Sequence, residues 1–157
     1  FYGRIEREGS MRLQAVDKDG KQCVLDTAQW NAPKTVLYFY PKDNTSGCTK
    51  EACDFRDNMN RLTTQADVIG VSPDSVASHQ KFKQKQELNF MLVADTEHQL
   101  AEFFGVWKEK SMYGRKYMGI ERSTFILDET GKILKEWRKV KVPGHVDEVL
   151  HALNNLG

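Results

Sequence analysis

Cysteine is scarce in this sequence, with three residues, Cys23, Cys48 and Cys53, among 157. An odd and low number argues against a secreted domain that is held together by disulfides. The length also makes such bridges unnecessary, because a chain of this size buries roughly 70% of its unfolded surface. We therefore predict one domain over residues 1–157, in a reducing compartment such as the cytoplasm.

Excess charge of one sign and long apolar runs are also missing. The 23 Lys and Arg against 22 Asp and Glu leave a net charge of +1, which predicts no binding to nucleic acid or to an acidic membrane surface. No apolar stretch approaches the roughly 20 residues of a membrane-spanning helix. Residues 1–10 lack the pattern of a signal peptide. They begin with Phe1 rather than Met, so the native start can be missing or replaced, and they carry little weight here.

Hydrophobic periodicity predicts alternating strands and helices. Continuous apolar, β-rich segments indicate buried strands, and apolar residues three and four positions apart indicate amphipathic helices. The predicted strands are 35–40, 66–72 and 90–95, and the predicted helices are 49–62, 73–87, 97–106 and 145–156. Turn residues predict hairpins around 17–20 and 129–132, and 108–121 is a predicted long polar loop. The pattern indicates an α/β fold with helices on both faces of a sheet.

The stretch "PKDNTSGC", residues 41–48, joins a predicted strand to a predicted helix. Pro41 fixes the backbone after the strand, three residues of helix-capping type follow, and Gly47 lets the backbone approach a ligand. Cys48 then lies in the first helical turn, among unpaired N–H groups at the positive end of the helix dipole. A thiolate is stabilised there, and the same groups can hold a small oxygen ligand. We therefore predict that Cys48 is a reactive thiol.

Cys53 follows five residues later. In an intact helix this spacing separates the two Cα atoms by about 8.6 Å, beyond the roughly 7 Å that a disulfide spans. The thiols can bond only if the first turn or two of the helix unwinds, which costs little at a helix end. The sequence therefore indicates a transient redox disulfide rather than a structural one. The C-x4-C spacing also differs from the C-x-x-C of thioredoxin-type reductases.

A metal site is the alternative use for two thiols, and the sequence disfavours it. The thiols point to different faces of the helix, and His79, His98, His145 and His151 show no ligand spacing. Cys23 lies in a predicted strand with nothing near it to activate it, so we interpret it as a core residue. No cofactor is predicted.

With these residues identified, the sequence resembles the peroxiredoxins. Pro41, Thr45 and Cys48 match the motif P-x-x-x-T-x-x-C, and Glu51 extends it as C-x-x-E. The second cysteine, five residues after the first, resembles the pattern of the bacterioferritin comigratory protein, or peroxiredoxin Q, subfamily. The stretches "VIGVSPDS" and "GIERSTFILD" also resemble that subfamily. The resemblance covers nearly the whole chain and implies a thioredoxin-like fold, with a central mixed sheet, flanking helices and an N-terminal hairpin. Ser46 stands where the family usually has proline, and the usual A-P-x-F near the start is absent.

The resemblance also implies the roles of the two cysteines and of their neighbours. Cys48 would be the peroxidatic cysteine and Cys53 the resolving one, joined in a Cys48–Cys53 disulfide during turnover. Thr45 would hydrogen-bond the peroxide, Pro41 would shield the pocket from water, and Arg122 would hold the thiolate and the peroxide.

The implied substrate-binding residues are Gly47, Thr45 and Arg122. Glu51 would join them, although its position is equally consistent with a surface residue or with a residue of a helix network. Met112, Tyr113, Tyr117 and Met118 would suit organic hydroperoxides if they formed an apolar wall near the pocket.

The implied reaction is antioxidant reduction of hydrogen peroxide and organic hydroperoxides to water and alcohols. Thioredoxin or a similar dithiol reductant would restore both thiols, and the subfamily is often monomeric. Two alternatives remain open from the sequence. One is a thiol–disulfide oxidoreductase on the same fold, although the exposed C-x-x-C is absent. The other is a peroxide-sensing redox switch that uses the same two cysteines.

Overall fold

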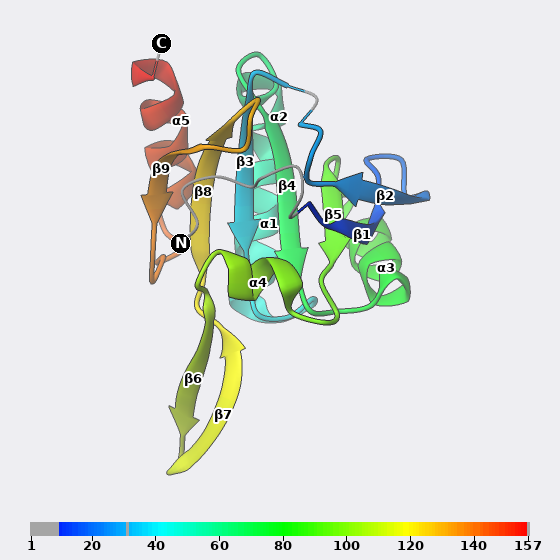
Figure 1. The fold of residues 1–157 in the computed structure, drawn as a ribbon, viewed down its shortest axis with the longest axis vertical. Coiled ribbons are helices and arrows are strands. Elements are labelled where there is room, and N and C mark those ends of the chain that lie inside the picture. The colour runs from blue at the N-terminus through cyan, green and yellow to red at the C-terminus, as the bar shows by residue number, and fades with distance from the viewer. Residues whose placement is uncertain (1–9, 31, 157) are drawn as a thin grey trace.

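A central β-sheet organises the part of the chain that the computed structural model describes, residues 10–30 and 32–156. Seven strands of this part pair in the order β2-β1-β5-β4-β3-β8-β9 (Figure 1). Strands β3, β4 and β5 are parallel, and the other pairs are antiparallel. The strands are β1 Arg12–Val16, β2 Gln22–Asp26, β3 Lys34–Phe39, β4 Asp67–Ser72, β5 Met91–Ala94, β8 Ser123–Asp128 and β9 Ile133–Trp137.

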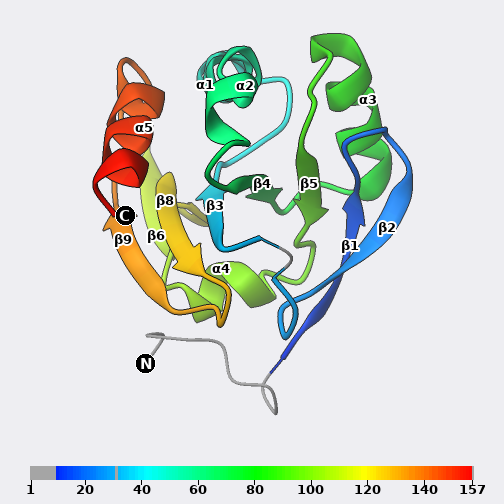
Figure 2. The same cartoon turned by 90° about the horizontal axis from the view of Figure 1, so that it is seen from above.

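Helices cover both faces of this sheet. Figure 2 shows α1 (Ser46–Asp57), α2 (Met59–Leu62), α3 (Val76–Gln86) and α5 (His145–Asn155) on one face, and α4 (Gln99–Phe103) on the other. Side chains of β3 alternate between two cores, with Val36 and Tyr38 beneath α1 and α5 and with Leu37 and Phe39 on the side of α4. Successive residues of a strand point to opposite faces, so the apolar run fills both cores. The predicted thioredoxin-like α/β fold, with its N-terminal hairpin β1–β2, is confirmed.

The helix after β3 begins earlier and ends earlier than the sequence predicts. The prediction was one helix over 49–62, whereas α1 begins at Ser46 and a short α2 follows a break at Asn58. The break has a local cause, because the Asn58 side chain donates to the Asp54 carbonyl oxygen at 2.8 Å while its backbone leaves helical geometry. Side-chain bonds of this kind compete with the helical ladder.

The prediction of a polar loop over 108–121 is wrong. These residues belong to a two-stranded hairpin, β6 (Trp107–Met112) and β7 (Arg115–Ile120), which extends beyond the main sheet (Figure 1). The turn residues Tyr113 and Gly114 both have positive φ, 53° and 78°, as a two-residue hairpin turn requires. Both strands are largely exposed, so their sequences show no alternation of apolar and polar residues. For this reason the hairpin was not predicted.

The prediction about the native start falls on residues 1–10, of which residues 1–9 lie outside the described part. Among the described helices, none is long and apolar enough to cross a membrane.

Candidate active site

The loop after β3 starts α1 at the carboxyl end of that strand. Thr45 is the N-cap residue, with an extended backbone, and its carbonyl oxygen accepts the Thr49 N–H at 2.8 Å. The Thr45 hydroxyl does not cap the helix but donates to the Lys42 carbonyl oxygen at 2.9 Å. Cys48 therefore lies in the first turn of α1, as predicted. It is only 2% exposed, so its sulfur faces a protected site.

A cation lies directly beside this sulfur. The Arg122 Nη2 is 3.4 Å from the Cys48 Sγ, and the Arg122 Nη1 donates to the Glu51 Oε1 at 2.6 Å. Gly47 leaves room for the guanidinium, because a Cβ at that position would lie 3.3 Å from the Arg122 Nη2. A guanidinium next to a sulfur at a helix N-terminus stabilises the thiolate. The arrangement thus brings together four residues that the sequence placed in the site.

Glu51 is the buried carboxyl of this group. Its side chain is fully buried, and its Oε2 has no hydrogen-bond partner among the described residues. Burial raises the pKa of Glu51 to about 7, although the charge and the hydrogen bond of Arg122 act in the opposite direction. The carboxyl therefore titrates near neutral pH while it stays in contact with the cation that touches Cys48.

A second buried network holds the loop in place. The Asp43 Oδ1 accepts from the Tyr40 hydroxyl at 2.7 Å, and the Asp43 Oδ2 accepts from Ser78 at 2.8 Å and lies 2.7 Å from the His79 Nδ1. The other ring nitrogen of His79 lies 2.9 Å from the Val93 carbonyl oxygen. This network ties the loop to α3 and β5. This network was not predicted from the sequence, because the only local signal for it was the position of Asp43 within "PKDNTSGC".

Cys53 has a different environment on the same helix. It is half-buried, and its thiol contacts the Gln86 Oε1 at 3.6 Å. The Arg56 Nη1 donates to the Gln86 carbonyl oxygen at 2.6 Å, so α1 is attached here to the end of α3. Both cysteines lie within the intact α1 and both are free. The structure therefore holds the two thiols on separate sides of one helix.

The remaining predicted residues lie at various depths. Pro41 is half-buried and Thr45 is exposed. Cys23 was interpreted as a core residue, but it is only half-buried and packs against the core on the α4 side. Burial is the main cause that raises the pKa of its thiol.

The four residues proposed as an apolar wall are all exposed and lie on the β6–β7 hairpin. Tyr113 is 98% exposed, and Met112, Tyr117 and Met118 are 44–55% exposed. They therefore form an exposed surface on the hairpin rather than a buried wall.

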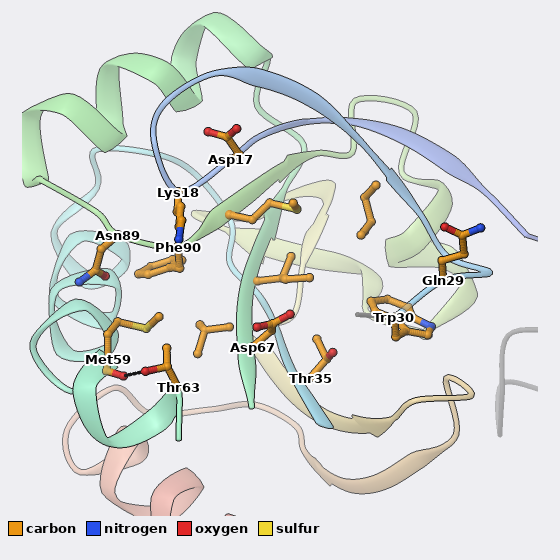
Figure 3. Close-up of a pocket in the computed structure, with 14 residues that line it drawn as sticks. Asp17, Lys18, Gln29, Trp30, Thr35, Met59, Thr63, Asp67, Asn89 and Phe90 are labelled. Atoms are coloured by element: carbon orange, nitrogen blue, oxygen red, sulfur yellow. Dashed lines mark hydrogen bonds between the residues drawn. The ribbon is translucent and has the colours of Figure 1, made fainter. Parts of the chain in front are cut away.

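A separate cavity of about 420 Å³ opens at the amino ends of the parallel strands. Figure 3 shows Thr35, Asp67 and Phe90 among its lining residues, together with Trp30 and Met59. Because Cys48 follows the carboxyl end of β3, this cavity lies at the opposite end of the sheet from the reactive sulfur. Within the described part of the chain, no group of three or more His, Cys, Asp and Glu side chains is placed to hold a metal ion.

Comparison with known proteins identifies the family of this chain. Residues 10–136 match the AhpC/TSA family. The chain is 58% identical to peroxiredoxin Bcp of Bacillus subtilis over 122 residues, which cover 77% of this chain and 78% of that protein. It is 49% identical to a putative peroxiredoxin bcp of Coxiella burnetii over 136 residues, 86% of this chain and 89% of that protein.

A solved structure extends the comparison to three dimensions. The bacterioferritin comigratory protein of Xanthomonas campestris, described by its alkyl peroxide reduction activity, superposes with a TM-score of 0.82 at 44% identity. The match covers 92% of this chain and 90% of that one. The chain thus belongs to the AhpC/TSA family. Within that family, the resemblance to the bacterioferritin comigratory protein and peroxiredoxin Q subfamily is confirmed, and with it the predicted class of enzyme, a thiol peroxidase.

Proposed function

We propose that Cys48 is the peroxidatic cysteine of this peroxidase. The observation that carries the proposal is the 3.4 Å contact between the Cys48 Sγ and the Arg122 Nη2 in the first turn of α1. There a cation lies beside one buried sulfur, at the end of the helix where backbone N–H groups lack intrahelical partners. The same groups can stabilise the negative charge that develops on the oxygens of a peroxide.

The first step is a displacement at oxygen. The Cys48 thiolate attacks one oxygen of the peroxide, the O–O bond breaks, and the leaving alkoxide or hydroxide takes up a proton as alcohol or water. The sulfur is oxidised to a sulfenic acid and the peroxide is reduced. Arg122 and the amides near Gly47 are placed at this end of the helix. Thr45 can join them if its hydroxyl turns away from the Lys42 carbonyl.

The second step joins the two cysteines. The Cys53 thiol displaces water from the sulfenic sulfur of Cys48, which gives a disulfide. The first turns of α1 must unwind for this, because the two sulfurs lie on different sides of the intact helix. The second half of α1 is the better anchored half, since Phe55 is fully buried and stacks on Tyr38 with ring centroids 4.5 Å apart. We therefore assign the unwinding to the Cys48 end.

A dithiol then restores both thiols by exchange. We propose thioredoxin or a similar protein dithiol as the reductant, hydrogen peroxide and organic hydroperoxides as substrates, and a monomer in the cytoplasm as the working form. The odd and low number of cysteines, three among 157 residues, supports a reducing compartment. The burial of Cys48 at 2% exposure argues against direct attack on protein disulfides, which a thiol–disulfide oxidoreductase would require.

Intact mass spectrometry after one equivalent of peroxide tests the proposal. We expect a loss of two hydrogens from the reduced chain, and peptide mapping should place a bridge between Cys48 and Cys53. Cys23→Ser is the matched control and should give the same bridge. A bridge that involves Cys23, or a chain that stays reduced while peroxide persists, would contradict the assignment.

A further inference from the structure

The β6–β7 hairpin exposes apolar side chains that no other part of the described chain covers. Four of the six large hydrophobic residues that are exposed in the described part lie on it, namely Met112, Tyr113, Tyr117 and Met118. A concentration of exposed apolar surface on a soluble domain marks an interaction site more often than chance. A peroxide is far smaller than this surface, so the hairpin fits a macromolecule.

The hairpin also concentrates positive charge. Four of its residues are cationic, Lys108, Lys110, Arg115 and Lys116, against the single acid Glu109, whereas the whole chain carries a net charge of only +1.

The strand register divides these residues between two faces. Lys110 pairs with Tyr117 and Met112 pairs with Arg115, and Lys108 lies two residues before Lys110. Side chains of directly paired residues share a face, as do residues two apart. One face, here called the basic face, therefore carries Lys108, Lys110, Met112, Arg115 and Tyr117.

This hairpin rises from the active site itself. Strand β7 ends at Ile120, two residues before Arg122, and the Arg122 guanidinium contacts the Cys48 sulfur at 3.4 Å. The carboxyl ends of β3 and β4 point to the end of the sheet from which the hairpin extends (Figure 1). A protein that reaches an oxidised Cys48 therefore also meets the base of the hairpin. Half-buried Lys110 lies within electrostatic reach of the site, since its pKa is lowered first by burial and then by the Arg122 cation.

We propose that the basic face of the β6–β7 hairpin is the docking surface for the protein dithiol that reduces the Cys48–Cys53 disulfide. The partner is a redox protein whose surface beside its dithiol is acidic and carries an apolar patch, because that chemistry complements three cations interleaved with Met112 and Tyr117. The inference rests on the proposed function and adds to it the surface that selects the reductant. Charge pairs at such a surface accelerate encounter more than they tighten the complex.

The test compares two reductants in one peroxide-consumption assay. One is an acidic thioredoxin with its reductase, and the other is dithiothreitol, which is too small to use a docking surface. In Lys108→Glu/Arg115→Glu we expect kcat/KM for thioredoxin to fall about tenfold, mainly through a higher KM, and dithiothreitol-driven turnover to stay within about twofold of the wild type. Added salt should weaken thioredoxin coupling in the wild type and have little effect in the variant.

The control keeps the change in charge and moves it elsewhere. Lys21 and Lys132 are exposed and lie in the β1–β2 and β8–β9 connections, and Lys21→Glu/Lys132→Glu should retain thioredoxin coupling within about twofold. Equal loss in this control, or unchanged coupling in the hairpin variant, overturns the proposal. An equal loss of dithiothreitol-driven turnover also overturns the proposal, since the hairpin would then affect the reaction with peroxide and not the docking of the reductant.

Other binding partners of the hairpin would give results that differ from those expected for the reductant. If the hairpin variant abolishes a concentration-dependent dimer, or binding to anionic vesicles, while thioredoxin coupling persists, the occupant is a second copy or a membrane and the proposal is overturned. A wild-type chain that consumes no peroxide with dithiothreitol contradicts the proposed function itself. That failure is therefore distinguishable from a failure of the docking surface.

Discussion

The two cysteines of α1 occupy opposite environments although five residues separate them on one helix. Cys48 is 2% exposed and lies 3.4 Å from a guanidinium that is itself fixed by buried Glu51. Cys53 is half-buried, and among the described residues its thiol is hydrogen-bonded to a neutral amide oxygen, that of Gln86, at 3.6 Å. The first thiol is surrounded by fixed charge, and the second is weakly held.

This difference suggests a division of labour. A rigid, charged site suits the attacking sulfur, because preorganised dipoles and cations stabilise developing charge without reorganisation. A weakly held thiol suits the second step, because only the contact with Gln86 has to break before Cys53 can bond to the Cys48 sulfur once the Cys48 end of α1 has unwound. Each of the following experiments tests one side of the comparison.

The largest effect is expected when either cysteine is replaced by serine. Cys48→Ser should abolish peroxide reduction, since no nucleophile remains at the charged site. Cys53→Ser should still consume one equivalent of peroxide and then fail to cycle with thioredoxin. Single-turnover and steady-state peroxide assays measure the two reactions. Residual peroxidase activity in Cys48→Ser above background, or wild-type cycling in Cys53→Ser, would show that the assignment of roles is wrong.

Removal of the Arg122 cation should affect the reaction of Cys48 and not that of Cys53. Arg122→Met is expected to lower the rate of reaction with peroxide about 100-fold. It should also lower the free energy of unfolding by about 3 kcal/mol at pH 8, because buried Glu51 then lacks its partner. Adding Glu51→Gln should restore much of the stability but not the rate.

Stopped-flow oxidation and urea unfolding give the two quantities, with the exposed Arg61→Met as control. If the double variant also regained the rate, Arg122 would act on Cys48 only through Glu51.

The raised pKa of Glu51 predicts a pH dependence of stability. The folded-state pKa of about 7 lies above the ordinary value of 4.5, so the native state binds more protons than the unfolded state between these values. The stability contribution of protonated Glu51 is therefore complete below about pH 4.5 and is lost as the pH rises through 7. Relative to Glu51→Gln, the wild type should lose up to about 3 kcal/mol between pH 4.5 and 8. Urea unfolding of both proteins over this range checks it, and a constant difference would count against a neutral buried carboxyl.

The smallest effect is expected on the Cys53 side. Gln86→Leu removes the acceptor of the Cys53 thiol, and the loss of one weak hydrogen bond of about 0.5 kcal/mol should speed disulfide formation roughly twofold. Acid-quenched mass spectrometry after one equivalent of peroxide measures this rate. Gln84→Leu, an exposed neighbour on α3, should leave it unchanged. A slower rate in Gln86→Leu would mean that Gln86 aims the thiol instead of restraining it.

The sequence predicted those parts of the site that depend on neighbouring residues. The strand before the loop, the capping residues and the position of Cys48 in the first turn follow from local rules, although β3 ends at Phe39 and α1 begins at Ser46, each earlier than predicted. Arg122 was assigned only through the family resemblance, because nothing local distinguishes an arginine before a strand. Its contact with Cys48 depends on the pairing of β3 with β8.

The remainder depends on packing between distant segments. His79 meets Asp43 only because α3 lies against the loop, and Gln86 meets Cys53 only because the end of α3 lies beside α1. The burial of Glu51 is likewise set by which side of α1 faces the sheet. The β6–β7 hairpin was not predicted for the opposite reason. It packs little against the core, so its sequence shows no hydrophobic periodicity.

The absence of a side chain at Gly47 has a consequence for how this loop can change. Its backbone does not require glycine, because it does not adopt the left-handed conformation. What residue 47 supplies is empty space, and one methyl group there would lie 3.3 Å from the Arg122 Nη2. A side chain there would push the guanidinium by a few tenths of an ångström from its position beside the sulfur, while the helix itself would still form. Because the same guanidinium contacts both the Cys48 sulfur and buried Glu51, a larger residue at position 47 would change the rate with peroxide and the free energy of unfolding together.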